Sequence, residues 1–293
     1  MLPDTLFNIR WNNRNSLLNV RCNQCRSSRS HLINIENGFK IVKCCDCGLV
    51  YVNPQPEEKD LMEFYQHYFP EDQGSPLRWE RMMGPVFNEV HQYISRNYSK
   101  GRLLDVGCSY GFFLQRFDRT KWELYGVDPS AHAVAYARKK LGRTIFTGPL
   151  TQQDFPDQFF DIITLFYVLE HVVDPLAFLT ELYRILKPKG LLVLRIPHSE
   201  PIIRFSKFFK MDIPLLYPPM HLYDFSPNTL KLILKKAGFR KISVEIGECT
   251  RMERFFQRAL LNVITRFSIV LSDVTKRIFL MPGLSKTAFA IRS

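Results

Sequence analysis

The most informative part of the sequence joins an acid to a run of small residues. An apolar stretch contains Asp105 and leads into the turn GCSYG at residues 107–111. We expect a buried strand that ends at the carboxyl edge of a sheet, where open α/β sheets bind ligands. Gly107 and Gly111 would let the backbone approach a ligand closely. The next expected strand ends in Asp128, whose carboxylate could accept hydrogen bonds from both hydroxyls of a ribose.

Two other kinds of site share parts of this pattern. An enzyme with a nicotinamide cofactor also carries an acid about 20 residues after its turn, as Asp128 is here. Its G-x-G-x-x-G motif is absent, because Ser109 replaces the second glycine and Gly111 comes one residue early. The nucleophile elbow of hydrolases, G-x-S-x-G, matches residues 107–111 but normally follows several core strands. A ligand without a pyrophosphate is favoured, and both alternatives stay open.

Five of the seven cysteines cluster near the amino terminus. Two C-x-x-C pairs separated by eighteen residues are typical of a four-thiolate zinc site. Four thiolates leave no open coordination position, so the expected zinc is structural. Gly48 tolerates the positive φ that a turn after the second pair needs, and Cys45 is a spare. The predicted ligands are Cys22, Cys25, Cys44 and Cys47.

The expected elements place these groups on a layered fold. From Gly101 onward, short apolar strands alternate with helices, which indicates a parallel sheet with helices on both faces. Ser130, Asp174 and Ser226 stand where helices should begin, and the last two precede a proline at the first helical position. A further helix is expected from residue 112 to 117, with its free N–H groups facing an anion such as a carboxylate.

Five segments stand in a recognisable order along the chain, namely LLDVGCSYG, YGVDPS, FDIITLFYVLEHVVDP, LKPKGLLVLRIP and HLYDFSPNTLKLILKKAGF. From residue 102 to 246 they resemble class I S-adenosylmethionine-dependent methyltransferases. The resemblance implies an α/β, Rossmann-like fold with a seven-stranded, mostly parallel sheet, helices on both faces and an antiparallel last strand. Ser109 departs from the commonest family pattern, which has Gly there. With the small zinc ribbon in front, the chain is also similar to bacterial sugar and polysaccharide methyltransferases.

The resemblance further implies which residues bind S-adenosylmethionine. Asp105 and the turn would surround its methionine end, and Asp128 would bind its ribose. Residues 147–150 would flank the adenine, and residues 166–167 would line the site after the fourth strand. The implied cofactor residues are Asp105, Gly107, Cys108, Ser109, Gly111, Asp128, Pro129, Leu150 and Phe166.

The residues that act on the methyl acceptor are predicted from their position in the chain and from the proton transfer that methylation requires. A hydroxyl or carbon acceptor must lose a proton as the methyl arrives, and a neighbouring base accelerates this step. The resemblance places the acceptor near Glu170 and His171, and imidazole titrates near neutrality. The sequence therefore predicts His171 as general base, with Glu170 orienting its ring and Tyr167 beside them. His198 and His221 lie on segments expected to cover the site.

These expectations divide the chain into three parts. A zinc-ribbon-like segment would occupy residues 1–56, and a helical linker residues 57–100. The methyltransferase domain would occupy residues 101–293, with an acceptor lid at 197–225 and a basic, apolar helical insert at 251–281.

The charge distribution bears on partners and location. Of the net charge of +12, ten units lie in the last third, where 16 Lys and Arg stand against 6 Asp and Glu. Such a block indicates an anionic partner. We expect a small-molecule or glycan acceptor, sugar- or nucleotide-linked, a cytoplasmic location, and peripheral contact of residues 251–281 with the anionic inner membrane surface. A nucleic-acid-binding zinc-ribbon protein is the alternative, less favoured because most excess charge lies far from the ribbon.

Overall fold

The computed structural model describes residues 17–66, 76–197, 216–246 and 285–293. Its main sheet has seven strands in the spatial order β12-β13-β10-β9-β6-β7-β8. Strand β13 is antiparallel to both of its neighbours, and the pairs among β10, β9, β6, β7 and β8 are parallel. The strands are β6 (Gly101–Val106), β7 (Trp122–Asp128), β8 (Ile145–Thr147), β9 (Phe160–Phe166), β10 (Leu186–Pro197), β12 (Arg240–Ile246) and β13 (Ser285–Ile291). The expected Rossmann-like sheet is therefore confirmed.

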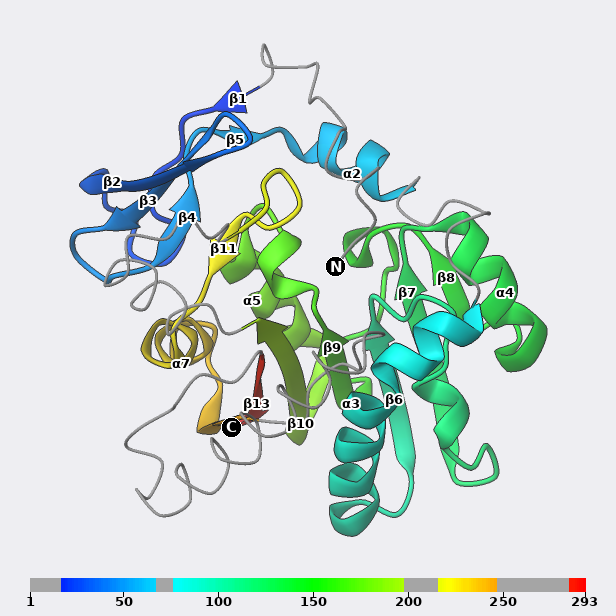
Figure 1. Ribbon diagram of the computed structural model, residues 1–293. Helices are drawn as coiled ribbons and strands as arrows, with labels where there is room; N and C mark the ends of the chain where they lie inside the picture. Colours follow the sequence, from blue (N-terminus) through cyan, green and yellow to red (C-terminus); the bar gives the residue numbers. More distant parts are fainter. Residues whose placement is uncertain (1–16, 67–75, 198–215, 247–284) are drawn as a thin grey trace, which may run out of the picture.

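Two hydrophobic cores cover the two faces of this sheet. Helices α3 (Pro76–Asn97) and α4 (Ala131–Leu141) share one core, and α5 (Pro175–Ile185) and α7 (Pro227–Lys236) share the other. Neighbouring strand residues alternate between the cores, as side chains of a strand must. Leu103, Ile162 and Val193 face the first core, whereas Leu104, Ile163 and Leu194 face the second. Figure 1 shows α4 beside β8 at one end of the sheet and α7 at the other.

The predicted helix starts are present. The side chains of Ser130, Asp174 and Ser226 accept hydrogen bonds from backbone N–H groups in the first turns of α4, α5 and α7. Each bond satisfies an N–H group that the first helical turn leaves without a partner. These capped helix starts fix where each helix begins relative to the sheet. They therefore also fix the loops at the carboxyl edge of the sheet.

A second, antiparallel sheet in the order β11-β4-β3-β2 lies against the main domain. Its strands are β2 (Ser30–Glu36), β3 (Phe39–Cys44), β4 (Val50–Val52) and β11 (Tyr223–Asp224). Strand β11 comes from the segment expected to cover the acceptor, yet it pairs with β4 near the amino terminus. A short pair, β1 (Leu17–Leu18) with β5 (Gln55–Pro56), precedes α2 (Glu58–Gln66). The amino-terminal segment is therefore joined to the main domain through a shared sheet.

One sequence expectation was wrong. The helix predicted from residue 112 to 117 is only a 3-10 turn, η2 (Leu114–Arg116). Phe113 and Phe117 turn inward to pack on each other, and Phe113 also packs on Phe166 of β9. This aromatic packing takes the place of a regular helix, so no helix N-terminus faces the turn.

Other expectations fall on parts of the chain that are not described. The insert 251–281 lies wholly outside the described residues, and so does most of the acceptor lid, including His198. Within the described part, no helix is long and apolar enough to cross a membrane.

Candidate functional site

The predicted cofactor residues meet at the carboxyl ends of β6, β7 and β9. Strand β6 pairs with β7 on one side and with β9 on the other. The chain leaves β6 toward β7 and later returns to β9, so the strand order reverses at this point. Open α/β sheets bind their ligands in the crevice at such a reversal. The fold thus gathers the turn 107–111, Asp128 and residues 166–171 at one edge.

The glycines of the turn are needed for packing and for backbone conformation. Gly107 and Gly111 have φ angles of +75° and +73°. A Cβ atom would come within 2.5 Å of Val168 at Gly107 and within 2.6 Å of Leu141 at Gly111. Any other residue would therefore be strained and would clash. Packing and backbone conformation therefore explain Gly107 and Gly111 without the close approach of a ligand.

Asp128 holds the turn in place. Its Oδ2 accepts a hydrogen bond of 2.8 Å from Ser109 N–H, and its Oδ1 accepts one of 2.9 Å from Ser130 N–H. The side chain is only 5% exposed, and burial raises its pKa to about 6 although both backbone donors act to lower it. The hydroxyl of Ser109 is buried and has no hydrogen-bond partner among the described residues.

Asp105 lies one strand away from Asp128. Its Oδ1 accepts a hydrogen bond of 2.7 Å from the Thr164 hydroxyl of β9. Burial raises the pKa of Asp105 to about 8, the Thr164 bond opposes this, and the charge of Asp128 raises it further. Two buried acids on neighbouring strands therefore have few hydrogen-bond donors around them. A polar ligand that donates further hydrogen bonds would be expected at such a site.

Four other predicted cofactor residues take different places. Cys108 is buried against Gly126 of β7, and Pro129 is half-buried after Asp128. Leu150 begins the 3-10 turn η3 (Leu150–Gln152) after β8. Phe166 is 8% exposed and packs edge-on against rings from α3 and η2. The structure thus brings all four to the same edge, with Cys108 and Phe166 serving the core as well.

Tyr167 follows β9 in a left-handed conformation, with φ of +58°. Its hydroxyl lies 3.3 Å from Nε of Arg195, a fully buried arginine on β10. Arg195 also donates to Glu89 of α3 at 3.1 Å and to Thr287 of β13 at 2.8 Å. A buried charge needs such partners. This network, which the sequence did not predict, fixes the position of the Tyr167 side chain.

His171 is held by the backbone and by α2. Its Nδ1 lies 2.6 Å from the carbonyl oxygen of Met220 and 2.7 Å from the hydroxyl of Tyr65. Because a carbonyl oxygen only accepts, Nδ1 carries the proton, and Nε2 is the nitrogen with a free lone pair. Burial lowers the pKa of His171 to about 4, although the carbonyls of Met220 and Tyr167 oppose the shift. The ring is therefore neutral at physiological pH.

Glu170 does not orient His171 as the sequence suggested. The Glu170 side chain is 1% exposed, and neither carboxyl oxygen has a hydrogen-bond partner among the described residues. Burial raises its pKa to about 8, the residue's own backbone N–H and the charge of Lys286 lower it, and the charge of Asp224 raises it. A carboxyl oxygen of Glu170 and ring nitrogens of His171 and His221 lie within 4.8 Å of one another. We call these three residues the Glu-His-His cluster.

Comparison with known proteins identifies the family to which the chain belongs. A profile described as methyltransferase domain matches residues 78–244, which is more than half of the chain. The chain belongs to the methyltransferase-domain family.

Relatives and solved structures agree with this assignment. A ubiquinone biosynthesis O-methyltransferase of Cereibacter sphaeroides is 32% identical over 151 residues, 47% of this chain and 59% of that protein. One from Rhodopseudomonas palustris is 36% identical over 97 residues, 32% and 38% of the two chains. The chain thus spans less than two thirds of the length of these curated relatives.

Two solved structures share the fold. A SAM-dependent methyltransferase from Archaeoglobus fulgidus has a TM-score of 0.51 and 20% identity, over 80% of this chain and 100% of that one. Phosphoethanolamine N-methyltransferase 2 of Haemonchus contortus, with phosphomonomethylethanolamine and S-adenosylhomocysteine, has a TM-score of 0.53 and 19% identity, over 83% and 62%. At this identity the likeness concerns the fold alone.

The four cysteines predicted as zinc ligands come together in the amino-terminal segment of the methyltransferase. Their sulfur atoms all lie within 4.8 Å of one another. The distance is 3.5 Å both from Cys22 to Cys47 and from Cys25 to Cys44, too long for a disulfide. Sulfurs on one tetrahedral zinc ion, at 2.3 Å from it, lie about 3.8 Å apart. Gly48 has the predicted positive φ of +77°, and exposed Cys45 lies outside the cluster.

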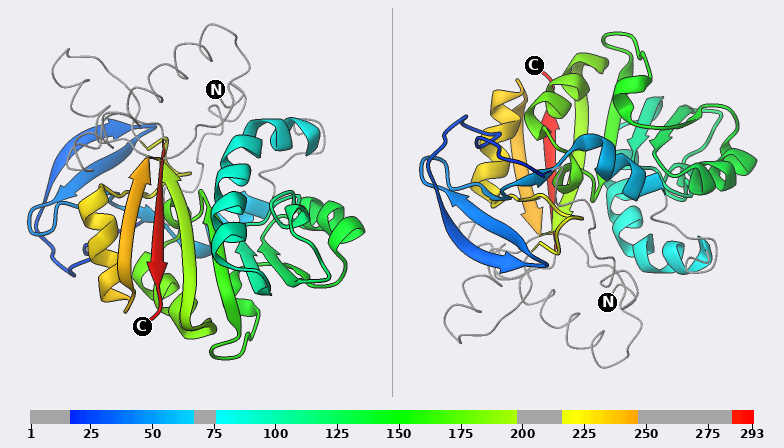
Figure 2. Two further views of the ribbon diagram at one scale, coloured as in Figure 1. Left: turned by 90° about the horizontal axis from the view of Figure 1, so that it is seen from below. Right: turned by 90° about the horizontal axis from the view of Figure 1, so that it is seen from above.

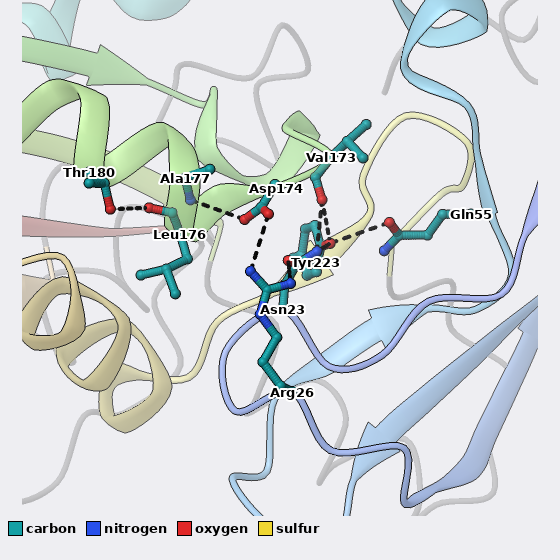
Figure 3. A network of polar contacts seen from close by, with 9 residues as sticks. All are labelled: Asn23, Arg26, Gln55, Val173, Asp174, Leu176, Ala177, Thr180 and Tyr223. Atoms are coloured by element: carbon teal, nitrogen blue, oxygen red, sulfur yellow. Dashed lines mark hydrogen bonds and ion pairs between the residues drawn. The ribbon is translucent and has the colours of Figure 1, made fainter.

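Hydrogen bonds join Asn23, which lies in the cysteine-containing turn, to the loop after β9 and to β11 (Figure 3). Asn23, between the first two cysteines, donates to the Tyr223 hydroxyl at 2.7 Å and to the Val173 carbonyl at 2.9 Å. Tyr223 itself donates to Val173 at 2.8 Å. Val173 and Tyr223 each stand two residues after a histidine of the Glu-His-His cluster. A weaker ion pair, Arg26 with Asp174, runs alongside at 3.5 Å.

Sequence reasoning missed the partners that come from distant segments. Tyr65 and Asn23 stand more than 100 residues before the groups they contact. Asn23 lies within the first C-x-x-C pair, but at a position that this motif leaves open. His221 was noted in a covering segment and at the start of a family-like segment, but not as a neighbour of Glu170 and His171. Its adjacency to a tyrosine-containing strand, HLYDF, is the one local signal that could have linked it to the site.

Proposed function

We propose that the protein transfers a methyl group from S-adenosylmethionine to a hydroxyl group of a small acceptor. The observation that carries this proposal is the buried carboxylate of Asp128, held against the turn after β6 at the point where the strand order reverses. S-adenosylmethionine supplies the methyl group as part of a sulfonium ion. The protein's own task is to orient the acceptor, exclude water and accept a proton.

Several groups at this edge fit the cofactor. Each oxygen of Asp128 accepts one backbone hydrogen bond, so each keeps a lone pair for a ribose hydroxyl. The unpartnered hydroxyl of Ser109 would bond to the methionine end, next to Asp105. Pro129 would contact the ribose, and Leu150 the adenine. Gly107, Cys108, Gly111 and Phe166 would shape the surrounding wall.

A hydroxyl acceptor is supported by the relatives that are named as O-methyltransferases. A sugar hydroxyl, as the likeness of the amino-terminal segment to sugar methyltransferases suggested, belongs to the same chemical class. We place this hydroxyl beside Tyr167, Glu170 and His171, because these groups follow β9 at the cofactor edge. These residues are assigned the task of promoting proton loss from the acceptor.

A structural zinc ion is proposed for the four-cysteine cluster. The sulfur separations fit one tetrahedral ion, and four thiolates fill its coordination sphere. Such an ion would stabilise the small sheet and, through Asn23, the loop that carries Val173. It would take no direct part in methyl transfer.

The proposal is tested by replacing Asp128 with alanine. Loss of a carboxylate that binds two hydroxyls should weaken S-adenosylmethionine binding by about 2–4 kcal/mol, or about 30- to 700-fold. Asp157→Ala is the matched control, because Asp157 is an exposed acid before β9, at the opposite edge of the sheet. Calorimetry that finds equal affinity in Asp128→Ala and in the unaltered protein would remove Asp128 from the site.

The same carboxylate predicts a pH dependence of cofactor binding. With a raised pKa of about 6, Asp128 is charged at pH 7 and above and becomes protonated as the pH falls below 6. Protonation removes an acceptor for the ribose hydroxyls, so affinity should fall by up to about tenfold per pH unit below 6. Asp128→Asn should bind S-adenosylmethionine more weakly, and its affinity should not fall with pH in this way.

Transfer of a radioactive methyl group to sugar or phenol hydroxyls, compared with amines, tests the acceptor class.

A further inference from the structure

The Glu-His-His cluster is the strongest feature that the proposed function leaves unexplained. Glu170 is almost fully buried, and both its carboxyl oxygens lack a hydrogen-bond partner among the described residues. A buried carboxyl group without a partner is costly, and such groups are normally paired or bound to a metal. The two imidazole rings beside it belong to His171 and His221, whose centroids are 4.8 Å apart.

We propose that Glu170, His171 and His221 bind a divalent transition-metal ion. One atom from each residue lies within 4.8 Å of the others. Donors on one ion at about 2.0–2.2 Å lie at most about 4.4 Å apart, so small side-chain adjustments bring all three onto a single ion. Two imidazole nitrogens and one carboxylate oxygen are the ligand set of catalytic zinc and of non-haem iron sites. This set leaves at least one coordination position open.

The surroundings of His171 support a ligand role. Its Nδ1 donates to the Met220 carbonyl, and the Tyr65 hydroxyl donates to that same carbonyl at 2.7 Å. A histidine that binds a metal through one nitrogen usually donates its other N–H group to a backbone carbonyl or carboxylate. The Met220 carbonyl therefore fixes the tautomer that presents Nε2. Met220 directly precedes His221, so one short segment orients one ligand and supplies the other.

A small cavity lies next to the cluster. A cavity of about 10 Å³, the room that one water molecule needs, is lined in part by Glu170, His221 and Asp224. Asp224 adds negative charge on this side, and Lys286 is directed to the Pro197 carbonyl at 2.7 Å. The cluster therefore has charged neighbours of both signs, and the cavity beside it has room for one small oxygen ligand of the ion.

The inference deepens the proposed function, on which it rests for the nature of the acceptor. An acceptor hydroxyl in the open position would bind the cation through oxygen, which lowers the pKa of that hydroxyl. Its proton leaves to water, and the oxygen forms the new bond to the methyl carbon. The bond between carbon and sulfur breaks, and its electron pair stays on sulfur. His171 then acts as a metal ligand, in place of the general base that the sequence suggested.

Zinc stoichiometry tests the site without any need for the acceptor. The full-length protein, first brought to one tightly bound zinc per chain, is titrated with Zn²⁺ in a calorimeter. We expect a second equivalent to bind, and the separate variants Glu170→Gln and His221→Ala to weaken that step at least about 100-fold, beyond what loss of an outer-shell partner costs. His132→Ala removes an exposed histidine of α4 and should leave the second step unchanged.

Two further readouts keep the outcomes distinct. The midpoint of thermal unfolding should rise with the second equivalent of zinc in the unaltered protein but not in Glu170→Gln. Glu170→Gln keeps the side-chain volume, and unchanged S-adenosylmethionine affinity shows that it is folded. A titration that stops at one zinc, or a second step of equal affinity in both cluster variants, would overturn the proposal. If the second zinc binds and S-adenosylmethionine does not, the metal site stands and the proposed function fails.

Discussion

Two clusters of metal-ligating side chains lie on either side of the hydrogen-bond path through Tyr223, and they are built in opposite ways. The cysteine cluster contains four soft sulfur donors from two turns of the small sheet. The Glu-His-His cluster contains three mixed donors from two loops of the main domain, beside a cavity. A four-thiolate set is closed, whereas a three-donor set leaves room for a substrate oxygen.

The difference between the two clusters predicts opposite effects on the stability of the protein. The cysteines sit in turns that the chain needs in any case, as the positive φ of Gly48 indicates. Glu170, in contrast, is buried where an apolar side chain of the same size would cost less. The first cluster is therefore expected to stabilise the protein. The second is expected to destabilise it until a ligand is bound, which is typical of a functional site.

The largest effect should come from Cys44→Ser. Structural zinc sites contribute about 10–16 kcal/mol in small zinc-binding peptides, so loss of one thiolate should release one zinc per chain and unfold the small sheet. Cys45→Ser is the matched control, because Cys45 is the exposed neighbour whose sulfur lies 3.7 Å from His31 Nδ1. Elemental analysis and thermal unfolding measure both effects. Equal zinc loss in the two variants would mean that the ligands are wrongly assigned.

An effect of opposite sign should follow from Glu170→Met. In protein that carries one zinc, removal of a buried, unpartnered carboxyl group should raise the free energy of unfolding by about 1–3 kcal/mol. With excess zinc, the unaltered protein should gain stability from its second ion and the variant should not. Urea unfolding at both zinc levels measures the change. A variant that is less stable at both levels would show that Glu170 has partners beyond the described residues.

The sequence predicted the main sheet and the cysteine cluster because both depend on local patterns. Alternating strands and helices, capping residues and C-x-x-C pairs are each visible within a short window. The helix expected from residue 112 to 117 failed because tertiary packing of Phe113 and Phe117 outweighed a local preference. Only short-range information was available to that prediction.

The sequence grouped Glu170 with His171 but did not place His221 beside them, because only local patterns could be recognised. Glu170 and His171 stand in one family-like segment and His221 begins another, 50 residues further on, and no local pattern shows that the three side chains meet. Tyr65, which steadies His171, comes from α2, a separate part of the chain. The structure shows no hydrogen bond between Glu170 and His171, because the Nδ1 proton of His171 goes to the Met220 carbonyl.

The smallest effect concerns the path between the clusters. If the Asn23–Tyr223 bond couples them, the double variant Asn23→Ala with Tyr223→Phe should differ from the sum of the single variants by about 0.5–2 kcal/mol in free energy of unfolding. Each single change leaves a buried partner unsatisfied, since Tyr223 is 2% exposed and Asn23 is 7% exposed. Tyr183→Phe is the control, because its hydroxyl bonds to Ser293 in an exposed position. Urea unfolding of the four proteins gives the coupling, and calorimetry of the second zinc step shows whether Tyr223→Phe also weakens the Glu-His-His cluster two residues away. Additive losses with an unaltered zinc step would show that the two clusters are energetically independent, and that the small sheet is only attached to the catalytic domain.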